Sequence, residues 1–409
     1  MVCALRRLAK DKRGNTLAIA AAALPMVMGA AGLATDTIQW VTWKRELQRA
    51  ADSAAISGVY ASAQNASVDT AVSSTVSRYN TTKVGLSTGY PQISYPTSAG
   101  WTSAVQVNLA VQKKLPFASM FLSTPPTITA TATAALTDDG DFCVIALDSS
   151  TSSGVTIGGN ASANLGCGVI ANSISGTSAV GTNGNSYDLI ASPVAAVGGL
   201  PSSIRGATNL KPFHVAMPDP YAGKYSTDLP SGMTCKANTN ASGAKDGSGR
   251  LNPGCYNAFS PGTITLNPGV YYLNNTGLSI NGNTTITGTG VTIIFTGTAP
   301  GTLSMNGNSV LSLTAPTTGD FAKMLMIQSN AATAGNSNKI NGNNGAKLDG
   351  AMYFPKGTLN FTGNSSPATK CAMIVAYHVD FGGSTDIQNN TTGCAANTTV
   401  SGKVVRLVA

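Results

Sequence analysis

The feature that most limits how this chain can fold is an uncharged apolar run near its N-terminus. Residues 16–34 carry no charge and consist mainly of Ala, Leu, Ile, Met and Val. Their length, about 19 residues, is close to what a helix needs to cross a bilayer core. A basic cluster comes before the run: Arg6, Arg7, Lys10, Lys12 and Arg13. Such clusters stay in the cytoplasm. The sequence therefore predicts a cytoplasmic segment at 1–14, one transmembrane helix at 15–35, and an extracytoplasmic remainder.

A cleaved signal peptide is the alternative interpretation of this run. Signal peptides have a shorter apolar core, followed by small residues at a cleavage site. Here Pro25 lies inside the run, and residues 36–60 continue without proline in a helical pattern. One face of that pattern is apolar: Leu47, Ala51, Ala54 and Ala55. We therefore expect an uncleaved anchor that continues into a stalk helix ending near residue 80.

The N-terminal segment also resembles a known family. The positions that carry the resemblance are Gly14, Asn15, Pro25, Gly32, Asp36, Leu47, Gln48, Ala50, Ala51, Asp52, Ala54 and Ala55. This segment resembles the N-terminus of TadG-like proteins of the tight-adherence (Tad/Flp) pilus system. The resemblance implies a bacterial inner-membrane protein whose partners are other pilus-assembly proteins, with a pilin-like α+β domain at 36–137. Pilins and TadE-like pseudopilins carry a Glu near their cleavage site, where Ile19 stands here, so the resemblance implies an anchored component.

Small and aromatic residues of the anchor predict what it contacts. Gly29 and Gly32, with neighbouring alanines, permit close helix packing, and we expect them to contact other helices of the pilus system. Trp40 and Trp43 follow the span, where amphipathic rings favour the membrane–water interface.

The composition favours β structure and excludes nucleic-acid binding. Charged residues are only 10% of the chain, while Gly, Thr, Asn and Ser abound, as in β architectures with many turns. The formal net charge is +8, and the cluster before the apolar run, five basic residues and Asp11, supplies +4 of it. The other +4 is spread over the rest of the chain, so we expect no nucleic-acid partner.

Six of the seven cysteines lie beyond the predicted span, and Cys3 lies before it. An even number in an oxidising compartment favours disulfides, and neighbour pairing is one of the 15 connectivities that six cysteines allow. The neighbouring pairs are Cys143 with Cys167, Cys235 with Cys255, and Cys371 with Cys394. Zinc is disfavoured because the chain has no CxxC motif and only two histidines.

Beyond residue 137 the pattern predicts a right-handed parallel β-helix. We expect its first coils at 138–190, an irregular Pro-rich excursion at 191–260, and further coils at 261–409. Short apolar runs end at corners rich in Asn and Gly: 158–160, 281–283, 306–308, 341–343 and 362–364. Their variable spacing favours coils with loops of different length, with Asn and Thr ladders along the bends. A β-sandwich is the alternative, since hairpins also use Asn-Gly turns.

Two further features are an apolar loop before this region and an acidic cluster at its start. A loop between two alternating strands has an apolar tip of Phe117, Met120, Phe121 and Leu122, which either packs on the sheet or forms a docking surface. The acidic cluster at 137–141 predicts a turn at the domain boundary.

Two sets of residues are weak candidates for chemistry. Asp148, Ser150 and Ser152 spell a D-x-S-x-S pattern that can bind a metal, or that caps a strand end with a Ser-rich turn. His378 and Asp380 would lie on one face of a strand and form the best catalytic pair. The chain has a single Glu, Glu46, in the stalk helix. We therefore expect no enzyme activity, no metal and no cofactor.

The sequence thus predicts a membrane-anchored structural component that acts through protein contacts. An anchored adhesin is the alternative, because segments 127–134 and 284–298 place Thr at alternating positions that suit a surface or glycan ligand. A β-helical enzyme that cleaves polysaccharides is the lesser alternative.

Overall fold

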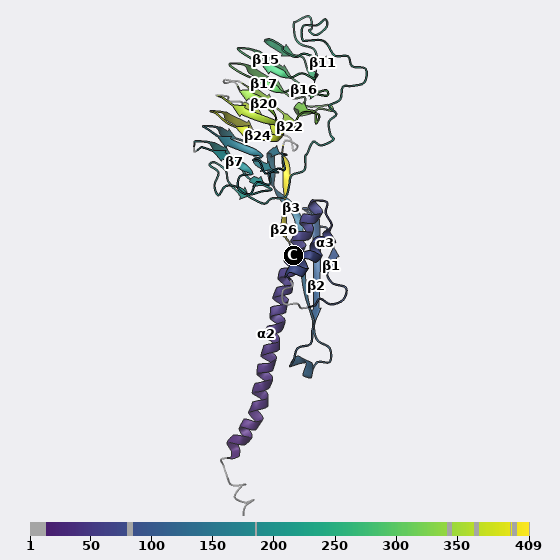
Figure 1. Cartoon of the computed structure of the whole chain (residues 1–409), viewed down its shortest axis with the longest axis vertical. Helices are drawn as coiled ribbons and strands as arrows, with labels where there is room; N and C mark the ends of the chain where they lie inside the picture. Colours follow the sequence, from purple (N-terminus) through teal and green to yellow (C-terminus); the bar gives the residue numbers. More distant parts are fainter. Residues whose placement is uncertain are drawn as a thin grey trace, which may run out of the picture. The chain divides into compact units, whose positions relative to one another are not determined.

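The computed structural model describes residues 14–79, 85–184, 186–341, 346–363, 368–392, 394 and 399–408. The predicted cytoplasmic segment with Cys3 lies outside this range, as do parts of the corners at 341–343 and 362–364. The chain divides into two compact units, Met1–Thr137 with Val404–Ala409, and Asp138–Lys403. The protein is mainly β, with one long apolar helix at its N-terminus (Figure 1).

The first unit begins with two helices. Helix α2 (Gly14–Ala63) runs without interruption through Pro25. It ends where Asn65 takes a φ of 54°, a left-handed conformation that Asn tolerates. Helix α3 (Val68–Tyr79) then starts at Ser67, whose hydroxyl accepts a hydrogen bond from Thr70 N at 3.3 Å. The prediction of one stalk helix to residue 80 is therefore wrong, because these two residues stop one helix and start another.

The helices cover one face of an antiparallel sheet. The strands are β1 (Gln92–Ser94), β2 (Trp101–Gln112) and β3 (Thr127–Ala146), in the order β1–β2–β3. Alternate residues of β2 and β3 are buried against α2: Val105, Val107, Leu109, Val111, Ala130, Ala132 and Ala134. This is the period of two that an antiparallel sheet with one covered face shows. Figure 1 shows the β2–β3 hairpin running alongside the helices.

The predicted turn at 137–141 is absent. Strand β3 continues through these residues, although the division between the two units falls between Thr137 and Asp138. The acidic side chains are held by residues distant in sequence: Asp138 pairs with Lys403, and Asp139 lies 2.6 Å from Lys211 Nζ. These partners allow an acidic segment to remain extended, which the sequence pattern alone did not indicate.

The C-terminal residues do not end the β region as predicted. Strand β26 (Val400–Leu407) leads from the second unit back to the first. Val405 packs against the apolar core of the first unit, and Val408 N donates to Thr133 O at 2.9 Å. The expected 261–409 region therefore stops near Lys403, because these last residues bury apolar surface elsewhere.

The second unit consists of three ladders of parallel strands. The first ladder has the order β11 (Gly254–Tyr256), β13 (Gly269–Asn274), β16 (Val291–Thr296), β19 (Met324–Gln328), β22 (Ala351–Thr362), β24 (Met373–Phe381), β3, β6 (Gly168–Ala171), β9 (Val194–Ala196) and β10 (Leu210–Lys211). The second has β14 (Leu278–Ile280), β17 (Leu303–Met305), β20 (Asn336–Asn341), the ends of β22 and β24, β4 (Val155–Gly158) and β7 (Val180–Asn183). The third has β12 (Ile264–Leu266), β15 (Thr285–Thr289), β18 (Val310–Thr314), β21 (Lys347–Asp349), β23 (Ala368–Lys370), β25 (Asp386–Asn390), β5 (Ser162–Asn164) and β8 (Asp188–Ile190).

The order of strands in each ladder is not the order of the sequence. The chain enters in the middle of the stack, at residue 138, and the coils up to Lys211 extend to one end. It re-enters at the other end, at Gly254, and returns coil by coil until β24 pairs with β3 and β4. The last coil therefore stacks on the first, so the two predicted β regions form one continuous stack (Figure 1).

The irregular excursion expected at 191–260 is shorter than predicted, because β9, β10 and β11 within it belong to the first ladder. Its remaining residues, 212–253, pack along the stack, and we call them the strap. Its contacts follow the ladder in order: Met217 N donates to Asn172 Oδ1 at 2.8 Å, and Tyr221 packs edge-on against Tyr353. Farther along, Thr227 O accepts from the Thr296 hydroxyl. The strap buries the outward-facing apolar row of the first ladder: Ile145, Ile170, Ala195, Cys255, Tyr272, Ile294, Ile327, Tyr353 and Val375. The Pro-rich segment is thus the cover of an apolar sheet face.

The corners of the stack use Asn and Gly as expected. Gly282 and Gly307 take φ values of 68° and 70° and lie against each other in adjacent coils. Beside them, Asn306 Nδ2 donates to Asn281 Oδ1 at 3.2 Å, which is a rung of the predicted Asn ladder. The backbone need for positive φ therefore explains why these corners recur.

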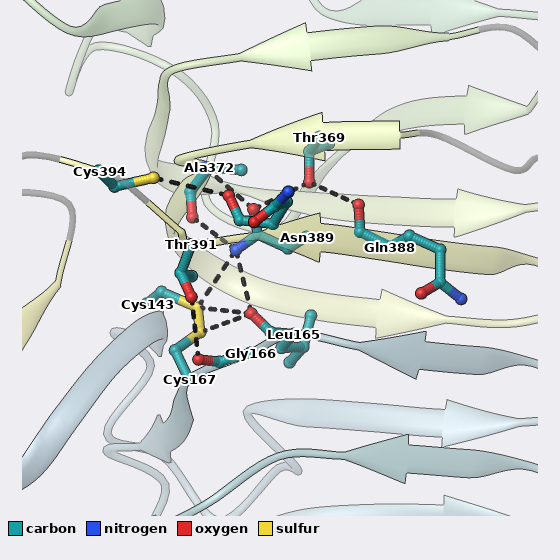
Figure 2. Close-up of a disulfide and its surroundings, with 11 residues drawn as sticks. Cys143, Leu165, Gly166, Cys167, Thr369, Ala372, Gln388, Asn389, Thr391 and Cys394 are labelled. Atoms are coloured by element: carbon teal, nitrogen blue, oxygen red, sulfur yellow. Dashed lines mark hydrogen bonds between the residues drawn. A yellow bond between two sulfur atoms is a disulfide. The ribbon is translucent and has the colours of Figure 1, made fainter.

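Three disulfides join the predicted neighbours: Cys143–Cys167, Cys235–Cys255 and Cys371–Cys394. The first lies where the last coil meets the first, beside the buried amide of Asn389 (Figure 2). Asn389 Nδ2 donates to Leu165 O at 3.1 Å and to Ala372 O at 3.2 Å. Its Oδ1 accepts from Ala372 N at 3.1 Å. One side chain thus satisfies polar groups of both coils at this joint.

We predict that Asn389→Ala lowers the free energy of unfolding of the second unit by about 2–3 kcal/mol, because it leaves buried backbone groups unpaired. Thermal unfolding of the full chain in detergent measures the change. Asn164→Ala is the control, since Asn164 contacts Gln388 on the neighbouring strand at the surface. Its expected cost is under about 0.5 kcal/mol. Equal effects of the two variants would contradict the role given to Asn389.

Candidate functional site

The first candidate site is the face of α2 that packs on the rest of its own unit. Small apolar side chains line it and are almost fully buried: Leu47, Ala50, Ala51, Ala54, Ala55 and Val59. Small residues here let the helix lie close to the sheet. Gln48 fixes its register, because Gln48 Nε2 donates to Asp52 Oδ1 and to Thr131 O, both at 2.9 Å. The residues that carry the family resemblance between 47 and 55 therefore form one packing face.

The N-terminal part of the same face holds the β2–β3 loop. The carboxylate of Asp36 accepts a hydrogen bond from Ala118 N, at the start of the short 3-10 helix η1 (Ala118–Met120), and only 3% of Asp36 is exposed. One turn earlier, the ring of Phe117 lies on Gly32, where an added Cβ would be 2.3 Å from Phe117 Cδ2. The structure thus gives Gly32 a partner within the chain. Contact of Gly29 and Gly32 with a second helix stays a prediction.

The tryptophans after the span are engaged by protein. Only 7% of Trp43 is exposed, and Lys113 Nζ lies 5.8 Å from the centre of its ring. Trp40 lines a crevice with Lys114 and Leu122 of the β2–β3 loop. Both rings therefore join the helix to that loop.

The second candidate site combines the two weak sets of chemical residues. Asp148 follows β3, and His378 lies in β24, which pairs with β3. His378 Nε2 is 2.7 Å from Asp148 Oδ2, and Ser150 Oγ donates to the same oxygen at 2.6 Å. The structure therefore brings a residue of the expected catalytic pair to the expected metal motif, because the last coil stacks on the first.

The other members of these sets take different partners. His378 and Asp380 lie on the same outward face of β24, as predicted, but Asp380 accepts a hydrogen bond from the Thr156 hydroxyl. Ser152 N donates to Ser150 Oγ at 3.2 Å. These bonds, with Ser150 N donating to Asp148 Oδ1 at 3.0 Å, are those of a Ser-rich turn. Within the described part of the chain, no group of three or more His, Cys, Asp or Glu side chains could hold a metal.

The arrangement does not activate a nucleophile. In a Ser-His-Asp triad, the imidazole stands between the hydroxyl and the carboxylate, so that it can take the proton of the serine. Here the carboxylate of Asp148 stands between Ser150 and His378 and accepts from both. A carboxylate can only accept, so His378 Nε2 carries the proton at this contact. The geometry therefore orients His378 without preparing Ser150 for attack.

Sequence analysis missed a buried polar cluster at the start of the second unit. His214 Nε2 lies 3.4 Å from Asp139 Oδ2, and both side chains are 2% exposed. Lys211 Nζ contacts the same carboxyl group and also donates to Asp139 O at 2.8 Å. The cluster joins the start of the strap to β3. The sequence contains no local pattern that predicts this cluster, because His214 and Asp139 are brought together only by the fold.

We predict that Gly32→Ala loosens the β2–β3 loop, because its methyl group would displace the Phe117 ring. Hydrogen exchange of the full chain in detergent is the measurement, and the Ala118 amide should exchange roughly tenfold faster or more. Gly29→Ala is the control, since an added Cβ there would lie 4.0 Å from Phe117 Cζ, an ordinary contact. Unchanged protection in Gly32→Ala would contradict the close packing.

We predict a pH-dependent cost for Asp148→Asn. Burial of the Asp148 carboxyl opposes its charge, but hydrogen bonds from Ser150, His378 and Tyr377 outweigh it, so its pKa lies below the ordinary 3.8. A carboxyl group whose pKa is lower in the folded state than in the unfolded state stabilises the folded protein at pH values above the ordinary pKa. This stabilisation is lost as the pH falls through the folded-state pKa. The variant should lose about 2 kcal/mol near neutral pH.

Unfolding measured from neutral pH down to pH below 3 tests this. The difference between wild type and Asp148→Asn should shrink at the acid end, whereas the exposed Asp228→Asn should cost little throughout. A difference in unfolding free energy that grows as the pH falls would contradict the predicted direction of the pH dependence.

The comparison with known families bears on the first site. Residues 14–65 match the family model described as "Putative Flp pilus-assembly TadE/G-like". No curated protein and no solved structure matches the chain. The matched residues cover the whole of α2, with both its uncharged run and its buried packing face. The N-terminal segment of this chain is therefore similar to the TadE/G-like segment of Flp pilus-assembly proteins.

Proposed function

We propose that the protein is a membrane-anchored structural component of a Flp/Tad pilus-assembly system in a bacterial inner membrane. The observation that carries this proposal is the match of residues 14–65 to the TadE/G-like family model. In this proposal the N-terminus is cytoplasmic, both units lie beyond the membrane, and the protein acts through contacts with other pilus-assembly proteins.

The exposed part of α2 supports membrane anchoring. This helix is long and apolar enough to cross a membrane, and 6% of its most apolar window is buried by protein. Large apolar side chains along it are exposed, such as Met26 (79%) and Val27 (66%). Water would disfavour such a surface, whereas lipid or neighbouring helices would cover it. The sharp change to a buried face after Asp36 suits a helix that leaves the membrane at this point.

We propose further that the second unit is a right-handed parallel β-helix. Support comes from its parallel in-register ladders and from the long strands β22 and β24, each of which belongs to two ladders. The β-sandwich alternative requires antiparallel pairing. A disulfide-bonded stack of this kind is a rigid body suited to an extracytoplasmic scaffold.

We also propose that the protein is not an enzyme. The support is the order of groups at Asp148, where the carboxylate occupies the place that a catalytic imidazole would need. Asp380, the other candidate, is bound to Thr156 and stands on the outer surface of a ladder.

An anchored adhesin remains the second candidate because one outward row of the second ladder is polar. Its members pair across successive coils: Ser279, Ser304, Lys339, Asn360, Asp380 and Thr156. The Thr-rich segment 284–298 supports adhesion less than expected, because Thr292 and Thr296 are buried.

The decisive experiment is affinity capture of the tagged full-length protein from membranes of its host, with identification of the bound proteins by mass spectrometry. The matched control replaces residues 14–31 by an unrelated apolar span and keeps Gly32 onward, so that Phe117 still packs on Gly32 and the first unit is unchanged. We predict recovery of pilus-assembly proteins or pilins with the wild type, and weaker recovery with the control if the helix itself makes the contacts.

Recovery of no pilus protein with either form would refute the assembly role. Binding of the protein to cells or glycans in that case would support the adhesin. Equal recovery with both forms would place the contacts on the extracytoplasmic units.

A further inference from the structure

The β2–β3 loop is fixed to α2 at the level where the uncharged run ends. Gln112 and Thr127 bound this loop, and two of its contacts set its height along the helix. Phe117 lies on Gly32, and Ala118 N donates to the buried carboxylate of Asp36. Gly32 belongs to the uncharged run, so the loop reaches down to the apolar part of the helix.

The tip of this loop is apolar and exposed. Met120, Phe121 and Leu122 are 74%, 72% and 45% exposed, and they follow one another in the chain. The prediction that the tip packs on the sheet is wrong for Phe117, whose ring lies on Gly32 of helix α2 instead. The alternative, an exposed surface, holds for the other three residues. Their exposure in water would be unfavourable. Leu33, which follows Gly32 in the helix, is also apolar and is 57% exposed.

Basic residues lie on the side of the tip toward strand β2. Lys113 and Lys114 are exposed and precede the tip, and Lys113 lies by the ring of Trp43. Trp43 stands 11 residues after Gly32, roughly 16 Å farther along a helix. Exposed apolar residues on one side and exposed lysines on the other are the order found at a membrane–water interface, where lysines attract anionic headgroups.

We propose that residues 117–122 insert into the leaflet that faces the extracytoplasmic units, beside the helix that spans the same bilayer. The protein then has two membrane contacts, a spanning helix and a short apolar loop. Because the loop is bound to Asp36 and Gly32, it holds the first unit close to the lipid surface and limits rotation about the helix. This inference rests on the membrane anchoring in the proposed function.

The test uses full-length protein in vesicles of phosphatidylcholine and phosphatidylglycerol, with Cys3→Ser as the background. Single cysteines at three positions carry an environment-sensitive NBD label: Phe121→Cys at the tip, Met26→Cys in the span, and Ser98→Cys. Ser98 is exposed at the opposite end of the hairpin, since Trp101 pairs near Thr137 and Gln112 pairs with Thr127. Spin-labelled lipids in the vesicles act as quenchers.

We expect lipid quenching at Phe121→Cys to approach that at Met26→Cys and to exceed that at Ser98→Cys roughly threefold or more, with blue-shifted emission. If lipid quenches the label at Met26→Cys but quenches Phe121→Cys no more than Ser98→Cys, the loop insertion is overturned and the anchor stands. Absence of quenching at both Met26→Cys and Phe121→Cys would overturn the anchor and the insertion together. A label at Phe121→Cys that is shielded from water-soluble quenchers but not reached by lipid would mean that protein covers the tip, and would also overturn the inference.

Discussion

The second unit depends on the parallel pairing of its last coil with its first. Strand β24 pairs with β3 and β4, and β25 pairs with β5, all in register. This pairing joins the coils of residues 138–211 to those of residues 254–390, so that backbone groups at the two inner ends find partners. Asn389 and the Cys143–Cys167 disulfide lie at this joint (Figure 2). The contact between Asp148 and His378 exists for the same reason.

This arrangement creates the need for the strap. The first set of coils ends at Lys211 and the second begins at Gly254, nine ladder steps away, or about 43 Å at the usual strand spacing. Residues 212–253 are long enough to cover this distance several times over, so they can fold onto the sheet. They bury the outer apolar row of the first ladder, which makes strands such as Met324–Gln328 buried on both faces. Parallel sheets covered on both sides have such continuous apolar runs.

Helix α2 combines two surfaces that meet at Asp36. Before this residue the side chains are apolar and mostly exposed, and after it one face is packed against the sheet and α3. The Asp36 carboxylate is buried but bonded to Ala118 N, so a charged group can stand at the boundary without losing its hydrogen bonds. The helix therefore serves both as the anchor in the proposed function and as the core element of the first unit.

Features that depend on local pattern could be predicted from the sequence alone. The length of the uncharged run, the alternation in β2 and β3, the Asn-Gly corners and the family resemblance each follow from neighbouring residues. The candidate site could be predicted only as two separate sets of residues, Asp148 with Ser150 and His378 with Asp380. Their meeting at one place could not be predicted. Only the folded structure shows that β24 pairs with β3, that the strap covers the first ladder, and that residues 404–408 pack in the first unit. These pairings join residues far apart in the chain, and the free energy that selects them comes from burial and hydrogen bonds that no local pattern encodes.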